Sequence, residues 1–367
     1  MVLQRSVEDI AKLVEVIEKV GPRNLSLVAR LAGIPVETAR YIVKVRLPRL
    51  GFRFRPVVNG KHLGLVMYFL KLSFSDKFRD LAPDVFDVLA RRAYITYYAA
   101  LLPHDYYIAL ASVPVTLEDK YRHLFELLAD EGVLNLHDIY PLDDIWWTSA
   151  DIRGFNIISG EWYAKLPRPS TYRSTRITRP ARGKPMVDKI DLLIIKELQK
   201  DPLQPFTRMA ETLGIKEHVL RYHYNEHVVN RGLIPRYQVV WSPREDLLEG
   251  NYIGLVLFYE GLDEEKFERI NSILKIIPFS SLEGVSKMRM TCVAIVRIPS
   301  SWLVRVLRLI REEVTFRNAT ISIIDTLRMK RYTIPYELFD DRLGWTLEEE
   351  KVLGAIGRLT AAASKAI

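Results

Sequence analysis

Two Arg-Tyr pairs stand at matched places in the two halves of this sequence, and their side chains suit contacts with nucleic acid. Arg40-Tyr41 and Arg221-Tyr222 are 181 positions apart. A guanidinium can bond guanine edges or phosphates, and a tyrosine hydroxyl can bond either group. Neighbouring basic or hydrogen-bonding side chains extend both pairs. The predicted DNA-contacting residues are Thr38, Arg40, Tyr41, Lys44, Arg53 and Arg55 in the first half, and Lys216, His218, Arg221, Tyr222, Asn225 and Arg236 in the second.

Three histidines in the second half have a spacing that could hold a metal ion. His218, His223 and His227 lie on one predicted helix, and the last two are four residues apart, so both would project from one helical face. No glutamate follows His223 as in the helix of a zinc protease. At the offset of 181, His223 corresponds to Ile42 and His227 to Arg46. Packing and surface roles therefore account for both histidines, and we predict no metal site.

Motifs typical of enzymes are missing from the sequence. We find no phosphate-binding glycine loop, no nucleophile elbow and no convincing pair of acidic residues. The sequence therefore predicts no catalytic residue, no cofactor and a protein that is not an enzyme.

Identities at constant offsets indicate that the chain repeats one plan. Gly64-Leu65-Val66 matches Gly254-Leu255-Val256 at an offset of 190, and later identities follow at 185. Each half is therefore expected to carry the same two modules in the same order. The identities at offset 181 are Ala29 with Ala210, Gly33 with Gly214, Ile34 with Ile215, Arg40 with Arg221, Tyr41 with Tyr222, and Gly51 with Gly232.

The first module of each half has the pattern of a winged helix-turn-helix. Apolar residues recur at helical spacing, and Gly33 and Gly214 stand where a left-handed turn residue is needed. The third helix of such a unit enters the major groove. The β-like segments 52–55 and 234–241 are expected to form the wings. The predicted helices span 7–20, 25–32 and a segment opened by Pro35 in the first half, and 187–198, 207–213 and 216–230 in the second.

The composition fits a soluble protein with a mild basic bias. The chain has 367 residues, 49% of them hydrophobic and 27% charged, and a net charge of +8, which suits a polyanionic partner without fixing a fold. Cys292 is the only cysteine, so an intrachain disulfide and a four-cysteine zinc site are excluded. No run of about 18 apolar residues suggests a membrane span. We expect a cytoplasmic protein that does not bind membranes.

A basic segment over 165–186 separates the two halves. It has no aspartate or glutamate and contains four prolines, so it is either a solvated spacer or an arm that contacts phosphates. Trp146, Trp147 and Trp162 are expected to pack a domain junction. The basic residues of the segment are Lys165, Arg168, Arg173, Arg176, Arg179, Arg182 and Lys184.

The sequence around the second helix-turn-helix resembles the N-terminal domain of Lrp/AsnC transcription regulators. The resemblance rests on Asp188–Asp201, Ala210–Ile215 and Arg231–Ile234. That family joins a winged helix-turn-helix to an α/β sandwich of βαββαβ order, which mediates dimerisation and often binds an amino acid. The usual member has one copy of each domain, whereas this chain resembles a fused pair.

The resemblance and the apolar patterns together predict an α+β fold, in which two winged helix-turn-helix domains alternate with two ferredoxin-like βαββαβ sandwich domains. Sandwich strands are expected near 63–72, 106–113, 134–140, 253–259, 291–298 and 320–327, and helices near 117–129, 263–276 and 301–313. The predicted domains are 1–60 (winged helix), 61–164 (sandwich), 165–186 (linker), 187–241 (winged helix), 242–340 (sandwich) and 341–367 (C-terminal helix).

Neither sandwich has the complete pattern of the family's amino-acid site. Asp105-Tyr106-Tyr107 is similar to the acidic-aromatic entry of a central strand but lacks the glycine before it, and the second copy has Gly284 without the acid. We therefore expect sandwiches that set the spacing of the DNA-binding units or mediate dimerisation, with any small-molecule effector unspecified by the sequence.

The favoured hypothesis is a transcription regulator that binds double-stranded DNA, as one fused chain or as a homodimer. One alternative is an enzyme similar to siroheme decarboxylases, a neighbouring family with related domains, for which the sandwiches offer His104, His123, Arg289 and Arg328. A second alternative is a chromatin protein or general transcription factor that binds duplexes with little sequence preference.

Overall fold

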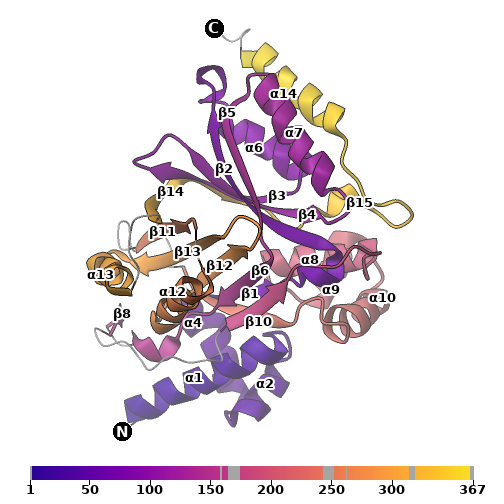
Figure 1. The fold of residues 1–367 in the computed structure, drawn as a ribbon. Coiled ribbons are helices and arrows are strands. Elements are labelled where there is room, and N and C mark those ends of the chain that lie inside the picture. The colour runs from indigo at the N-terminus through magenta and orange to yellow at the C-terminus, as the bar shows by residue number, and fades with distance from the viewer. Residues whose placement is uncertain are drawn as a thin grey trace.

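The protein has an α+β fold in which helical units surround one large antiparallel sheet (Figure 1). The computed structural model describes residues 2–157, 159–163, 174–242, 252–261, 263–313 and 319–363. Within the described residues, no helix is long and apolar enough to cross a membrane.

Each half begins with a three-helix unit of the predicted helix-turn-helix type. Gly33 and Gly214 follow the second helices with φ of 69° and 66°, so both adopt the left-handed conformation that the sequence predicts. Each third helix starts as an α-helix and continues as a π-helix. The first unit contains α1 (Val2–Val20), α2 (Leu25–Ala32), α3 (Val36–Tyr41), η1 (Ile42–Arg46) and α4 (Leu47–Arg49), and the second contains α8 (Lys189–Lys200), α9 (Phe206–Leu213), α10 (Glu217–Tyr222) and η5 (His223–Val229).

The segments predicted as wings pair with each other instead of projecting toward DNA. Strand β1 (Phe52–Val57) runs antiparallel to β10 (Arg236–Trp241), with Phe52 opposite Trp241. The first helix of each unit packs on the strand of the other unit, α1 on β10 and α8 on β1. The wing prediction is wrong because the apolar face of each short strand is buried by the other repeat, which lies far away in the sequence.

Both halves then form a βαββαβ unit with the strand order of a ferredoxin-like sandwich. The sheet order is β5-β2-β4-β3 in the first half and β14-β11-β13-β12 in the second. The first half contains β2 (Leu65–Phe74), α6 (Ala82–Arg92), β3 (Ile95–Leu102), β4 (Tyr107–Pro114), α7 (Glu118–Asp130) and β5 (Leu134–Pro141), and the second contains β11 (Tyr252–Tyr259), α12 (Glu264–Ile276), β12 (Ser281–Ser286), β13 (Thr291–Pro299), α13 (Leu303–Glu313) and β14 (Ala319–Arg331).

The last strand of the second sandwich and the strand that follows the first sandwich each pair with the other half and join the two sheets. At Ile323 and Ile324, β14 pairs with both β11 and β3, and after a bulge it pairs with β3 of the first half alone. Strand β6 (Asp144–Thr148), which directly follows β5, pairs with β12 of the second half. Strand β9 (Ser174–Thr178) pairs with β6 and completes a ten-stranded sheet. The two halves therefore share one hydrogen-bonded framework.

Apolar side chains fill two separate regions. Helices α6 and α7 cover the outer face of the first half-sheet, with α14 (Glu349–Ala363) packed on these helices, and α12 and α13 cover the outer face of the second (Figure 1). A smaller cluster that includes Phe69, Leu110 and Leu282 lies between the inner faces. The remaining short elements are α5 (Gly60–Leu63), η2 (Asp76–Phe78), η3 (Ile152–Gly154), β7 (Phe155–Asn156), β8 (Glu161–Trp162), η6 (Ser300–Trp302), η8 (Tyr336–Leu338), β15 (Phe339–Asp340) and β16 (Gly344–Trp345).

Candidate functional site

A cavity of about 420 Å³ lies where the β1–β10 ribbon meets the inner faces of the two half-sheets. Both halves contribute to its wall, from Met67 and Tyr97 in the first to Leu282 and Ile295 in the second. The reciprocal strand crossing produces this space, because β6 and β14 hold the two inner faces opposite each other.

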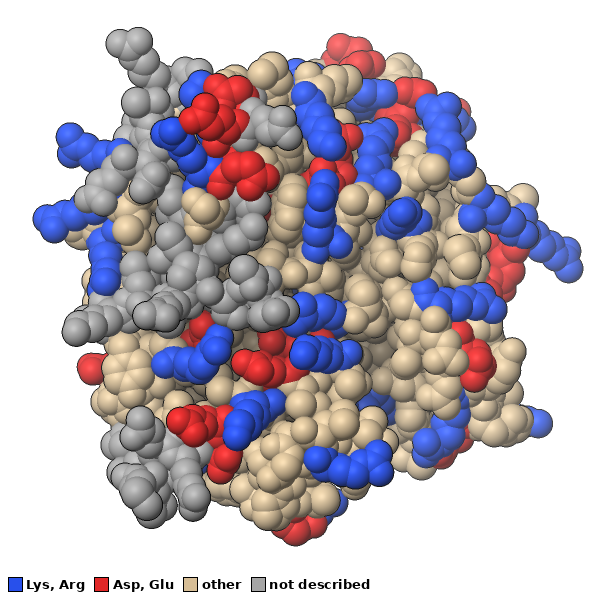
Figure 2. Space-filling view, turned by 60° about the horizontal axis from the view of Figure 1, so that its bottom comes forward, with Lys and Arg blue, Asp and Glu red and all other residues tan. Residues whose placement is uncertain are grey.

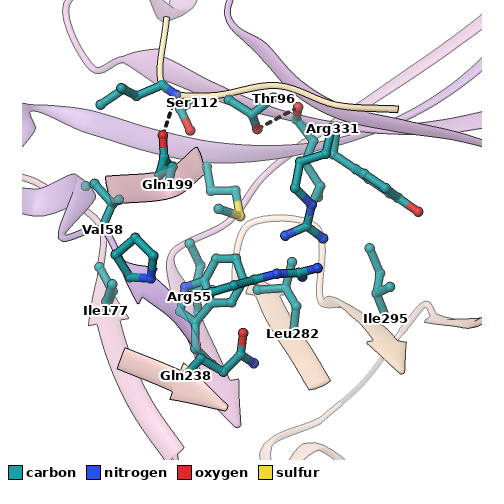
Figure 3. Close-up of a pocket in the computed structure, with 18 of the residues that line it drawn as sticks. Arg55, Val58, Thr96, Ser112, Ile177, Gln199, Gln238, Leu282, Ile295 and Arg331 are labelled. Carbon is teal, nitrogen blue, oxygen red and sulfur yellow. Dashed lines mark hydrogen bonds between the residues drawn. The ribbon is translucent and has the colours of Figure 1, made fainter. Parts of the chain in front are cut away.

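Three arginines from different elements converge on this cavity. Arg55 comes from β1, Arg297 from β13 and Arg331 from the end of β14. Figure 3 shows the guanidinium groups of Arg55 and Arg331 pointing into the same space. Among the described residues, none of the three forms a salt bridge, and no aspartate, glutamate or histidine lines the cavity. The cavity therefore carries positive charge without an anionic partner from the described chain.

The surroundings of Arg55 and Arg331 destabilise the charged forms of these two side chains. Burial lowers the pKa of Arg55 well below the usual arginine value, and the charges of Arg331 and Arg297 lower it further. Burial also lowers the pKa of Arg331, with Arg297 acting in the same direction and Tyr97 opposing it. Arg331 is exposed by its accessible surface and lines the cavity. An anion in the cavity would relieve both the desolvation and the mutual repulsion.

Tyr97 lies against the arginine cluster, which we define as Arg55, Arg297 and Arg331. The guanidinium of Arg331 lies 5.6 Å from the centre of the Tyr97 ring. Burial raises the pKa of Tyr97, while the three arginines oppose this rise. Its hydroxyl donates only a long hydrogen bond of 3.9 Å to Met329 Sδ. The phenol is therefore neutral, and no strong acceptor that the structure describes holds its proton.

The remaining wall of the cavity combines apolar, aromatic and polar groups. Trp147 and Trp241 contribute indole rings. Gln238 Nε2 donates to the carbonyls of Thr148 (2.8 Å) and Ser281 (3.1 Å), so its orientation is fixed. The two other cations at the wall have acidic partners, because Arg179 is paired with Glu118 (2.6 Å) and Lys200 with Glu197 (3.1 Å).

The residues predicted to contact DNA divide into two groups. Most lie exposed on the third helices or nearby, but Arg40 forms an ion pair with Glu37, and Arg221 forms one with Glu217 at 2.6 Å. On the face shown in Figure 2, basic side chains are interspersed with acidic ones. The exposed residues are Thr38, Arg40, Tyr41, Lys44, Arg53, Lys216, His218, Arg221, Tyr222 and Asn225.

Arg55 and Arg236 do not occupy the exposed wing positions that the sequence suggests. Arg55 lines the cavity, and Arg236 lies half-buried near Glu18, at 3.9 Å. Pairing of β1 with β10 explains both placements, because it turns the supposed wings inward.

The residues predicted for the decarboxylase alternative are not gathered at one site. His104 stacks on Tyr106, His123 is paired with Glu126, and neither lines the cavity. Arg289 and Arg328 also lie outside the cavity wall. Sequence reasoning missed Arg297, Arg331 and Tyr97, although Arg297 stands alone in the apolar run of β13, which is a signal for a buried cation.

Two arginines of the basic segment between the halves form ion pairs within the protein. Arg176 is paired with Asp144 at 2.9 Å, and Arg179 with Glu118. Lys165, Arg168 and Arg173 lie outside the described residues. Trp162 packs against Phe52 and Trp241, as expected for a junction, whereas Trp147 lines the cavity.

Two solved structures share the fold over nearly the whole chain. One is the crystal structure of the siroheme decarboxylase NirDL, with a TM-score of 0.53 and 13% sequence identity, covering 96% of this chain and 99% of that chain. The other is the same enzyme in co-complex with an iron-uroporphyrin III analogue, with a TM-score of 0.53, 11% identity and the same coverage. No family model matches the sequence, and no curated protein is similar to it.

The comparison corrects the prediction that the chain is not an enzyme. The structures with the same fold are those of an enzyme, and they match both halves of the chain. The prediction relied on local motifs, and the shared fold is not visible in such motifs.

Proposed function

We propose that this chain is an enzyme that binds a carboxylated tetrapyrrole of the siroheme type in the cavity and removes carboxyl groups from its side chains. The observation that carries the proposal is the arginine cluster, whose three members line one cavity with no carboxylate from the described residues. The shared fold with a siroheme decarboxylase supports it.

The cavity has two properties that suit such a ligand. Guanidinium groups bind carboxylates through paired, charge-assisted hydrogen bonds, and the ring of this substrate class carries several carboxylate side chains. The aromatic and aliphatic wall, including Trp147, Trp241 and Leu282, suits the flat apolar face of the macrocycle. A small monoanion would engage only part of this surface.

The chemistry requires a proton donor beside the carboxyl group that leaves. When the bond between the acetate methylene and its carboxyl carbon breaks, CO₂ departs and the electron pair stays with the ring and methylene carbon. A proton on that carbon then gives a methyl group. Tyr97 Oη supplies this proton, the charge of Arg331 opposes the effect of burial, which disfavours the tyrosinate, and water then restores the proton. Arg55 and Arg297 orient the ring through carboxylates that are retained.

The direct test is titration of the purified full-length chain with siroheme and with iron uroporphyrin III, followed by visible absorbance. We expect saturable binding of both tetrapyrroles. We also expect siroheme to be converted to products that have lost CO₂, which mass spectrometry identifies. Arg331→Gln should weaken binding at least about tenfold, since one hydrogen-bonded charge contributes about 1.5–3 kcal/mol. The matched control is Arg308→Gln, which changes an exposed arginine on α13, away from the cavity.

Two outcomes would reject this function. The parent chain could fail to bind either tetrapyrrole, or Arg308→Gln could weaken binding as much as Arg331→Gln does. Binding without loss of CO₂ would leave the cavity a tetrapyrrole site and would reject the reaction.

DNA binding is a second candidate, favoured by the exposure of the third helices. Tyr41 and Tyr222 have 53% and 58% of their surface accessible, which is high for large aromatic side chains. The two helices occupy matched places in the repeats, as a palindromic site requires. This candidate includes two functions: a transcription regulator, and a protein that binds DNA duplexes with little sequence preference.

A further inference from the structure

Four side chains that can bind metals meet inside the second helix-turn-helix unit, away from the cavity. They are Asp188 and Asp191 at the start of α8, and His223 and His227 on η5. One ligand atom from each lies within 4.8 Å of all the others. We propose that this cluster is a binding site for one divalent transition-metal ion of the Zn²⁺ class, which ties α8 to the third helix.

The distances between the ligand atoms fit a tetrahedral ion. Asp191 Oδ1 lies 2.9 Å from the Nδ1 atoms of both His223 and His227. Asp188 Oδ2 lies 3.4 Å from His223 Nδ1 and 3.7 Å from His227 Nδ1. Ligand bonds of about 2.0–2.1 Å imply tetrahedral edges of about 3.3–3.4 Å. Small side-chain shifts would therefore admit an ion between the four atoms.

The backbone already orients the two carboxylates for this role. Asp188 and Asp191 form a reciprocal capping box, in which the amide of Asp191 donates to Asp188 Oδ1 (3.0 Å) and the amide of Asp188 donates to Asp191 Oδ2 (3.2 Å). One oxygen of each carboxylate is thus held by the helix start, and the other faces the histidines. Hydrogen bonds of this kind support metal ligands in known sites.

The donor set selects the type of ion. Two imidazole nitrogens favour Zn²⁺ and similar transition metals over Mg²⁺ and Ca²⁺, which prefer oxygen ligands. Two carboxylates balance the charge of a divalent ion. Asp191 is fully buried and His227 is 7% exposed, while the Asp188 side chain is 38% exposed and provides an edge through which the ion enters.

The first repeat shows that the helix-turn-helix itself does not require this cluster. At the offset of 181, the positions of Asp188, Asp191 and His223 are held by Val7, Ile10 and Ile42. Ile10 is fully buried and Ile42 is 4% exposed, and both belong to the apolar core there. Arg46 occupies the position of His227 in the first repeat. All four ligand-type residues are therefore found in the second repeat and none at the matched positions of the first.

The test uses the full-length chain after removal of metals with a chelator. Titration with Zn²⁺ against a chromophoric chelator should give one ion per chain, a rise in Tm, and no competition from Mg²⁺. Co²⁺ should give the visible absorption of a tetrahedral site. The double variant His223→Gln/His227→Gln should bind at least about 100-fold more weakly, which corresponds to loss of two of four ligands. His218→Gln, an exposed histidine on the same helix, should bind like the parent.

A second variant separates metal binding from folding. Asp188→Asn keeps a side chain that caps helices well and removes one charged ligand, so it should fold normally and bind Zn²⁺ more weakly. The proposal is wrong if the parent binds no Zn²⁺, or if His218→Gln lowers the affinity as much as the double variant.

Discussion

The guanidinium groups of Arg55 and Arg331 point into one cavity, although one residue belongs to the strand that follows the first helix-turn-helix and the other to the last strand of the second sandwich (Figure 3). Neither has a carboxylate partner among the described residues. Proteins tolerate such arrangements where a ligand supplies the missing charge, at a cost in the stability of the free protein.

Arg55→Gln should therefore stabilise the free protein while weakening the binding of iron uroporphyrin III. Loss of one enclosed charge relieves the repulsion from Arg297 and Arg331, and we expect a gain of about 0.5–2 kcal/mol in the free energy of unfolding. Urea unfolding measures the gain, and absorbance titration measures the loss of affinity. A variant that is less stable and binds equally well would show that the arginine cluster is only structural.

Tyr97→Phe should lower kcat much more than it changes KM. The substitution keeps the ring beside Arg331 and removes the hydroxyl, so binding persists while proton transfer is lost. General acid catalysis contributes a factor of about 10²–10⁴, and we expect a fall of that order. If KM rises and kcat stays constant, Tyr97 contributes to binding and another group is the proton donor.

The repeat and the α+β fold could be read from the sequence because both rest on local signals. Gly33 and Gly214 mark the helix turns, and the apolar runs around Leu65 and Leu255 mark first strands. The cavity could not be predicted in the same way. Arg55 and Arg331 approach each other only through the pairing of β1 with β10 and the crossing of β14 to β3.

The predicted roles of the histidines illustrate the same limit. The spacing of His223 and His227 is visible in the sequence, and the match to Ile42 favoured packing. Asp188 and Asp191 stand far upstream, and no periodic pattern connects them to the histidines. Only the packing of α8 on η5 brings the four side chains together.

Asp87→Asn should reduce stability near neutral pH, and the reduction should disappear in acid. Burial acts to raise the pKa of Asp87, but Lys330 Nζ, at 2.6 Å, and the Tyr332 hydroxyl hold it below the usual value of 3.8. The stability that this depressed pKa confers is full above 3.8 and is lost as the pH falls through the folded-state value.

The partial exposure of the ion pair between Asp87 and Lys330 limits how much stability Asp87→Asn removes. Because the Lys330 side chain is 48% exposed, we expect a loss of about 1 kcal/mol at about pH 7, which shrinks as the pH falls below 3.8 and through the folded-state pKa. Urea unfolding of parent and variant across this range measures it. A difference that stays constant with pH would show that the charge of Asp87 does not stabilise the packing of α6 on β14.

Arg40→Ala/Arg221→Ala should weaken binding to duplex DNA if the third helices are the DNA-binding surface, by about 1–3 kcal/mol for each arginine that reaches the duplex. The opposite result is expected for Glu37→Gln/Glu217→Gln, which frees both arginines from their ion pairs. Fluorescence anisotropy with a labelled duplex at several salt concentrations measures both. Equal affinity for parent and both variants would exclude these helices as the DNA-binding surface.

Trp162→Ala should destabilise the junction between the two repeats by about 3–5 kcal/mol, the range for truncation of a buried tryptophan. Its ring packs edge-on against Phe155, Trp241 and Phe279, with centroids 5.2, 5.7 and 4.8 Å away. This packing joins β8 to the β1–β10 ribbon and to the second sandwich, so its removal should affect the whole chain and appear as one lower unfolding transition.

Trp162→Phe is the matched variant. The Trp162 indole N–H has no hydrogen-bond partner among the described residues, so phenylalanine keeps aromatic packing and removes an unsatisfied donor. We expect it to cost less than half as much as alanine in urea unfolding. Equal losses of stability for both variants would mean that the indole makes an interaction that aromatic packing does not explain. A destabilisation below about 1 kcal/mol for alanine would mean that the two repeats are held together elsewhere.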